Sequence, residues 1–232
     1  MSTPSGGGPS VIHDLGYRGY DGPRRSSIAI ARTLFVTGLL HAYGFKRSNR
    51  SKALPWALLG FNLVPAAVMV GVMALTKMDP PLGYADYSLQ MQVLSSIFAA
   101  AQAPVLFSRD LRHGSIVLYL ARPLSAGMLA VTRWLSLACA IAIFLLATVL
   151  LLFIGSLLAG HDAATHAQQA GKAALAVLLL AALLASITGV LSAWSTRRGF
   201  AVVGSIAVLV LGGGVVAIVQ ALAIDAGSSL VG

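Results

Sequence analysis

The chain has 232 residues, of which 57% are hydrophobic and only 10% are charged, and its mean hydropathy is +0.84. Soluble domains carry about 25% charged residues, so this composition excludes an ordinary water-soluble domain, and it is far too apolar for a disordered chain. The single cysteine, Cys139, excludes an intramolecular disulfide. We therefore predict an integral membrane protein.

The N-terminal segment 1–27 is polar and rich in Gly, Pro and Ser, without the apolar stretch of a secretory signal peptide. We expect it to be cytosolic. In the following residues, 28–52, apolar Ile28 and Leu34 are mixed with Arg32. This composition favours an amphipathic helix on the inner membrane surface, followed by a basic linker. The alternative is a short span, which would place the N-terminal arginines outside the cell.

Five stretches of the remaining segment, 53–232, lack Lys, Arg, Asp, Glu and His and are long enough to cross about 30 Å of hydrocarbon. A backbone in hydrocarbon must satisfy its own hydrogen bonds, so these spans are predicted to be helices. The predicted fold is thus all-α, with the N-terminal surface helix and five spans, at about Ala53–Thr76, Leu89–Phe107, Leu135–Leu158, Ala173–Trp194 and Phe200–Ala223.

The basic residues predict the direction of these spans. With the N-terminus in the cytoplasm, every Lys and Arg except Lys77 and Lys172 falls on the inner side, as the positive-inside rule requires. The net charge of +9 is then explained by topology and by contact with anionic membrane lipid, and not by nucleic-acid binding. We predict a multi-pass protein of the cell membrane with a cytoplasmic N-terminus.

The chain lacks the usual signs of catalysis. Ionisable groups at membrane depth are missing from the predicted spans, and no phosphate-binding loop occurs. His161 and His166, with Asp162 between them, match no metal-ligand spacing, so they are predicted to be solvated loop residues. We expect no enzymatic activity in the chain itself, no cofactor and no metal.

The predicted spans do contain uncharged polar side chains, among them Asn62, Gln92 and Gln102. An unpaired amide in hydrocarbon costs several kcal/mol, so these groups should face other helices or a cavity. Interhelical hydrogen bonding and a place in a translocation path are the two alternatives. Pro65 and Pro104 can interrupt the helical hydrogen bonds locally.

The segment between the second and third predicted spans, Ser108–Ser125, carries both signs of charge and an apolar face of Ile116, Val117 and Leu120. Gly114 can end one helix, and Pro123 can start the return turn. An amphipathic helix held here could act as a lever for a cytosolic partner. The alternative is an ordinary basic loop.

The same segment resembles the intracellular signature of permease subunits of type-2 ABC exporters, the antibiotic and polysaccharide export class. That pattern has an acidic and a basic residue together, then a Gly, a leucine-rich stretch, and Pro with Ser before the third span. It corresponds here to Arg109-Asp110, Gly114, Leu118–Leu120 and Pro123-Leu124-Ser125. The leader Asp14–Arg24 and the surface helix resemble the N-terminal part of one branch of these permeases.

The resemblance implies a permease that forms a translocation path with a second permease copy or relative and couples to separate cytosolic ATPase subunits. It implies that the ATPase contacts Arg109, Asp110, Gly114 and Pro123. Such permeases have six spans, so either a C-terminal span has been lost or truncated here, or the architecture differs. A non-transporting membrane scaffold or assembly protein is the alternative function.

Overall fold

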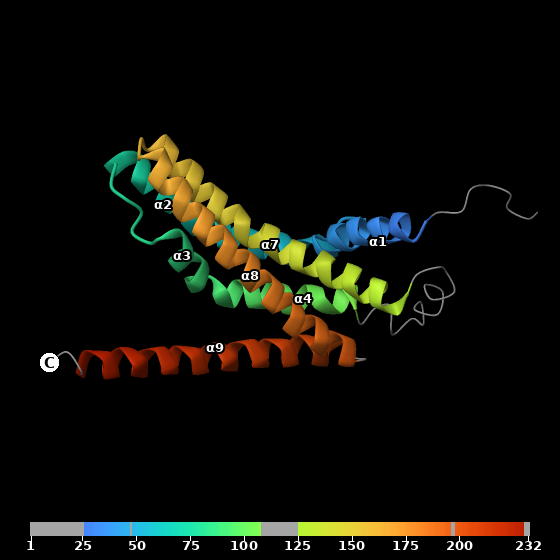
Figure 1. Ribbon diagram of the computed structural model, residues 1–232. Coiled ribbons are helices and arrows are strands. Elements are labelled where there is room, and N and C mark those ends of the chain that lie inside the picture. The colour runs from blue at the N-terminus through green and yellow to red at the C-terminus, as the bar shows by residue number, and fades with distance from the viewer. Residues whose placement is uncertain (1–25, 47, 108–124, 196–197, 230–232) are drawn as a thin grey trace, which may run out of the picture.

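The computed structural model describes residues 26–46, 48–107, 125–195 and 198–229, and all the regular elements within these ranges are helices (Figure 1). The predicted all-α fold is confirmed for this part of the chain. The helices are α1 (Ser27–Ala42), α2 (Arg50–Thr76), α3 (Tyr84–Gln90), α4 (Gln92–Leu106), α7 (Ala126–Leu158), α8 (Ala163–Trp194) and α9 (Arg198–Ser229).

Three of the described helices, α2, α7 and α8, are long and apolar enough to cross a membrane, and the bent pair α3 and α4 together make a fourth candidate. These helices indicate a multi-pass membrane protein. The fifth predicted span lies within α9, and the apolar part of this helix that the structure describes in full, Gly199–Gly214, covers only part of that span. Five spans therefore stay a prediction.

The second predicted span is not one straight helix. Helices α3 and α4 meet at Met91 with a bend of 60°, whereas α4 continues through Pro104. The bend follows from the tyrosines of α3, which are tied to other helices. Tyr87 donates its hydroxyl proton to the backbone oxygen of Asn62 on α2 at 2.7 Å, and Tyr84 bonds to Ser156 on α7 at 3.0 Å.

Helices α7 and α8 each begin before the predicted span that they contain. Helix α7 begins at Ala126, where the Ser125 hydroxyl accepts a hydrogen bond from the Met128 amide. Helix α8 begins at Ala163, where the Asp162 carboxylate accepts from the Thr165 amide at 2.8 Å. Residues 163–172 are therefore helical and not an outer loop, because Ala and Gln favour a helix and Asp162 caps it.

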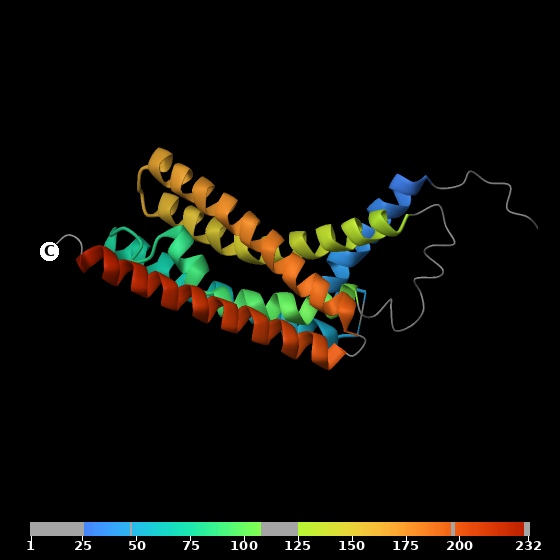
Figure 2. The ribbon, with the colours of Figure 1, turned by 60° about the horizontal axis from the view of Figure 1, so that its bottom comes forward.

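The helices run between two ends of the molecule (Figures 1 and 2). The α1 end contains α1, the start of α2, the end of α4, the start of α7, and the junction of α8 and α9. The α3 end contains the end of α2, helix α3, and the turn from α7 to α8. Helix α7 passes through the centre, where Phe144 stacks on Phe98 of α4 with ring centroids 4.7 Å apart.

The two ends differ in charge as the positive-inside rule predicts. The described basic side chains Arg32, Lys46, Arg50 and Lys52 belong to the α1 end, while Lys77 and Lys172 lie towards the α3 end. The tryptophans occupy the starts of α2 and α7 and the end of α8, so all three also belong to the α1 end. That the α1 end faces the cytoplasm stays a prediction.

Candidate functional site

The four predicted ATPase-coupling residues, Arg109, Asp110, Gly114 and Pro123, lie outside the described residues. The structure does describe the two points between which their segment is held. Helix α4 ends with its C-cap at Phe107, and α7 starts after its N-cap at Ser125. Both helix ends lie at the α1 end (Figure 2).

Helix α1 packs closely against α7 and α4 at this end. Its buried residues Leu34, Gly38 and Ala42 are spaced four apart and thus share one face. A Cβ atom at Gly38 would lie 2.8 Å from the Ser136 hydroxyl and 3.0 Å from Leu106. The Ser136 hydroxyl lies 2.8 Å from the Thr132 backbone oxygen on its own helix and 3.2 Å from the Phe35 backbone oxygen on α1, and both oxygens can accept its proton. A glycine at position 38 is what permits this contact.

The turn between α1 and α2 is fixed to the core by Tyr43. Its hydroxyl donates to the backbone oxygen of Ala140 on α7 at 2.8 Å, and its ring packs against Phe98. Burial raises the pKa of the Tyr43 phenol, so the hydroxyl stays a donor. Gly44 follows with a φ of +77°, a backbone conformation that residues other than glycine rarely adopt.

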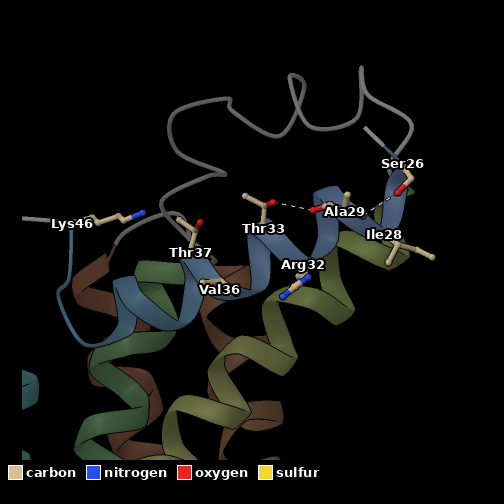
Figure 3. Close-up of a pocket in the computed structure, with 8 residues that line it drawn as sticks. All are labelled: Ser26, Ile28, Ala29, Arg32, Thr33, Val36, Thr37 and Lys46. Atoms are coloured by element: carbon tan, nitrogen blue, oxygen red, sulfur yellow. Dashed lines mark hydrogen bonds between the residues drawn. The ribbon is translucent and has the colours of Figure 1, made fainter. Parts of the chain in front are cut away.

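The outward face of α1 forms an open groove of about 720 Å³ (Figure 3). Its cationic side chains are Arg32 and Lys46, and no acidic residue is among the described residues that line it. Ile28 and Val36 on the same face are exposed. This mixture of apolar and cationic groups suits contact with anionic lipid or with an acidic protein surface.

A second groove, of about 390 Å³, lies at the α1 end between α4, α7 and α8. Its lining is almost entirely apolar and includes Phe107, Val131 and Val190. Trp134 and Ser186 also line the groove, and the Trp134 indole N–H donates to the Ser186 hydroxyl at 3.0 Å. The groove can accommodate an apolar chain next to Phe107, the residue that precedes the predicted coupling segment.

Asn62 is fully buried and joins α2 to α7. Its amide nitrogen donates to the Thr148 hydroxyl at 2.7 Å and to the Phe144 backbone oxygen at 3.3 Å. Its side-chain oxygen has no hydrogen-bond partner among the described residues. These contacts are the interhelical hydrogen bonding that the sequence suggested as one alternative. A role for Asn62 in a translocation path stays a prediction.

The other two amides predicted for such a path lie on α4. Gln102 is buried, with 3% of its surface exposed. Gln92 is half-buried, and its amide nitrogen would lie 3.7 Å from a Cβ atom at Gly213 of α9. The structure thus places Gln92 beside α9, and neither of the two grooves described above is lined by Asn62, Gln92 or Gln102.

The prediction that His161 and His166 are solvated loop residues is wrong for His166. His166 belongs to α8 and is 6% exposed, and its Nδ1 atom lies 2.7 Å from the Tyr84 hydroxyl. His161 is also largely covered and lies with His166 beside Asp79. The sequence could not reveal this cluster, because its members lie far apart in the chain. The only sequence signal is the His–x₄–His spacing, which is common.

Across the residues that the structure describes, no group of three or more His, Cys, Asp or Glu side chains is arranged to hold a metal ion. Cys139 is a free, half-buried thiol on α7. No protein-family model, no curated protein and no solved structure matches the chain.

Proposed function

We propose that the chain is the permease subunit of an ATP-driven ABC exporter, which couples at its α1 end to separate cytosolic ATPase subunits. The chain itself has no enzymatic role in this proposal, because ATP hydrolysis belongs to the partner. A second permease copy or relative completes the translocation path. The substrate class that fits apolar spans with scattered amides is an amphiphile.

The observation that carries the proposal is the convergence of α1 with both anchors of the segment 108–124. The resemblance assigns ATPase contact to this segment and to the surface helix. The end of α4, the start of α7 and α1 all lie at one end of the described bundle (Figure 2), which also holds most of its described basic residues. A single cytosolic partner could therefore touch both segments at once.

The packing of α1 also provides a route for force. A push on α1 reaches α7 through the Gly38–Ser136 contact and the Tyr43–Ala140 hydrogen bond. Helix α7 is tied to α2 through Asn62 and to α3 through the bond from Tyr84 to Ser156. Rigid helices linked in this way can shift together between two arrangements, as alternating access requires.

The exposed apolar surfaces of the helices are suited to contact with lipid and with a second permease copy. Large side chains are exposed along α2, α8 and α9, among them Phe61, Leu75, Leu179 and Leu211. In a membrane these faces meet lipid tails or another subunit.

The alternative, a non-transporting scaffold, is favoured by one observation. The Asn62 amide nitrogen is used in bonds between α2 and α7, as a purely structural amide would be. A scaffold needs no path and no coupling to ATP hydrolysis.

Co-purification with the ATPase tests the proposal. The variants Asp110→Lys and Gly114→Trp are expected to lose at least ten-fold in the amount of ATPase recovered and to lose stimulated ATP hydrolysis, because both change the proposed contact. The matched controls Asp86→Lys and Gly171→Trp make the same changes at exposed positions towards the other end, where a Cβ at Gly171 meets nothing within 4 Å, and should behave as wild type.

Recovery of the ATPase at wild-type strength from both coupling variants would contradict the coupling assignment. An ATPase that binds without any stimulated hydrolysis would favour the scaffold.

A further inference from the structure

The α3 end contains a polar cluster of which the proposed function uses only the bond from Tyr84 to Ser156. Its members come from three parts of the chain: Asp79 from the loop 77–83, Tyr84 from α3, and Ser156, His161 and His166 from α7, the following turn and α8. The side chains of His161 and His166 are 12% and 8% exposed, whereas that of Asp79 is 82% exposed. The cluster therefore consists of two covered imidazoles facing an accessible carboxylate.

The hydrogen bonds determine where the proton of each neutral imidazole lies. The Ser156 hydroxyl donates to the Phe153 backbone oxygen at 2.8 Å, so it accepts the Tyr84 hydroxyl proton at 3.0 Å. The Tyr84 oxygen must then accept from Nδ1 of His166, 2.7 Å away. Nδ1 of His161 lies 3.2 Å from the Ser156 backbone oxygen, which can only accept. Both imidazoles therefore carry a proton on Nδ1.

A neutral imidazole has one N–H, so each Nε2 atom presents a lone pair. These two Nε2 atoms lie 3.5 Å (His161) and 3.8 Å (His166) from the same Asp79 carboxylate oxygen, which is also only an acceptor. Both distances exceed the roughly 2.7–2.9 Å of a charge-assisted N–H···O bond. Nε2 of His161 is buried, and no described residue forms a hydrogen bond with it. Three acceptors thus face one another with no hydrogen between them.

We propose that Asp79, His161 and His166 form a proton-binding site. A proton added to either Nε2 atom turns an acceptor pair into an imidazolium–carboxylate ion pair. The pair fastens the loop 77–83, and with it the start of α3, to the turn between α7 and α8. A metal ion fits less well, because no metal-holding arrangement exists among the described residues. The proposal holds whether or not the chain is a permease.

The other charged groups at this end are compatible with proton uptake. Asp162 caps α8, where hydrogen bonds from Thr165 and, to a smaller extent, the charge of His166 lower the pKa of its carboxyl group. Asp86 lies on α3 next to Gly83. The cations are Lys77, at the start of the loop, and Lys172, further along α8. The charge of Asp162 stabilises an added positive charge on His166.

Distance measurements between two spin labels on the full chain test the proposal. In a Cys139→Ala background, Met78→Cys labels the loop beside Asp79, and Ala164→Cys labels an exposed position on α8. The sample is held in lipid nanodiscs with a chelator present. Between about pH 8 and about pH 5.5, the range in which imidazoles take up protons, we expect the distance to shorten and its distribution to narrow.

The response should disappear in Asp79→Asn and in the His161→Gln, His166→Gln double variant. It should persist in Asp86→Asn, which removes a neighbouring exposed carboxylate, since both imidazoles lie beside Asp79. Helical content and elution volume at both pH values verify the fold of each variant. A wild-type chain with no response, an Asp79→Asn variant with the full response, or a response that needs added Zn²⁺ would each overturn the proposal.

Discussion

At the residue scale, the sequence predicts that the amide of Asn62 must be paired, but it does not identify the residue that pairs with it. Asn62 lies in an apolar run, so its need for a partner follows from the cost of an unpaired amide. Its actual partner, Thr148, is a residue of another helix, and nothing local in the sequence links the two. The prediction that His166 is a solvated loop residue is wrong for a similar reason. Tyr84 and Asp79, which lie beside its ring, are distant from it in the sequence.

Removal of the Asn62 amide should destabilise the bundle. Interhelical hydrogen bonds within membranes contribute about 0.6 kcal/mol on average and up to about 1.7 kcal/mol. We expect Asn62→Ala to lower the free energy of unfolding by an amount in this range or somewhat above it, since packing is also lost. Reversible unfolding in mixed detergent micelles, followed by tryptophan fluorescence, measures the change.

Asn49→Ala is the matched control, because Asn49 is exposed and its side chain caps no helix. If the two variants were equally stable, Asn62 would have no structural role, and its assignment to a translocation path would gain support.

At the element scale, hydropathy predicted the interiors of the long helices and missed their ends. Hydropathy reports what tolerates a bilayer, whereas a helix end depends on local caps such as Ser125 and Asp162. The break at Met91 carries no Gly or Pro signal, and it arises from tyrosine contacts to α2 and α7. The groove on α1 and the close contact of α1 with α7 depend on tertiary packing, so they too could not be predicted from the sequence.

The close packing of α1 predicts a strong effect of a larger residue at position 38. In Gly38→Leu the new side chain would overlap Ser136 and Leu106 and displace α1 from α7. Overpacking of this kind costs about 1–3 kcal/mol, which the same unfolding measurement detects.

Gly60→Leu on α2 controls for the helix propensity of leucine, because a Cβ at Gly60 meets nothing within 4 Å. A Gly38→Leu variant as stable as Gly60→Leu would show that α1 does not depend on this contact.

At the scale of the whole molecule, the distribution of basic residues predicted two chemically different ends, and the fold groups the described residues accordingly. The predicted coupling residues Arg109, Asp110, Gly114 and Pro123 lie outside the described part, so their proposed role rests on the resemblance. Both the proposed ATPase contact and its accessible surface on α1 require that the α1 end faces the cytoplasm.

The side of the membrane on which each end lies is therefore the most direct test of the account. In a Cys139→Ala background, single cysteines at Gly127 and at Ala164 place one exposed thiol at each end. In intact cells, a membrane-impermeant maleimide should label Ala164→Cys and leave Gly127→Cys unlabelled until the membrane is permeabilised. Labelling of Gly127→Cys in intact cells, with Ala164→Cys protected, would contradict the account.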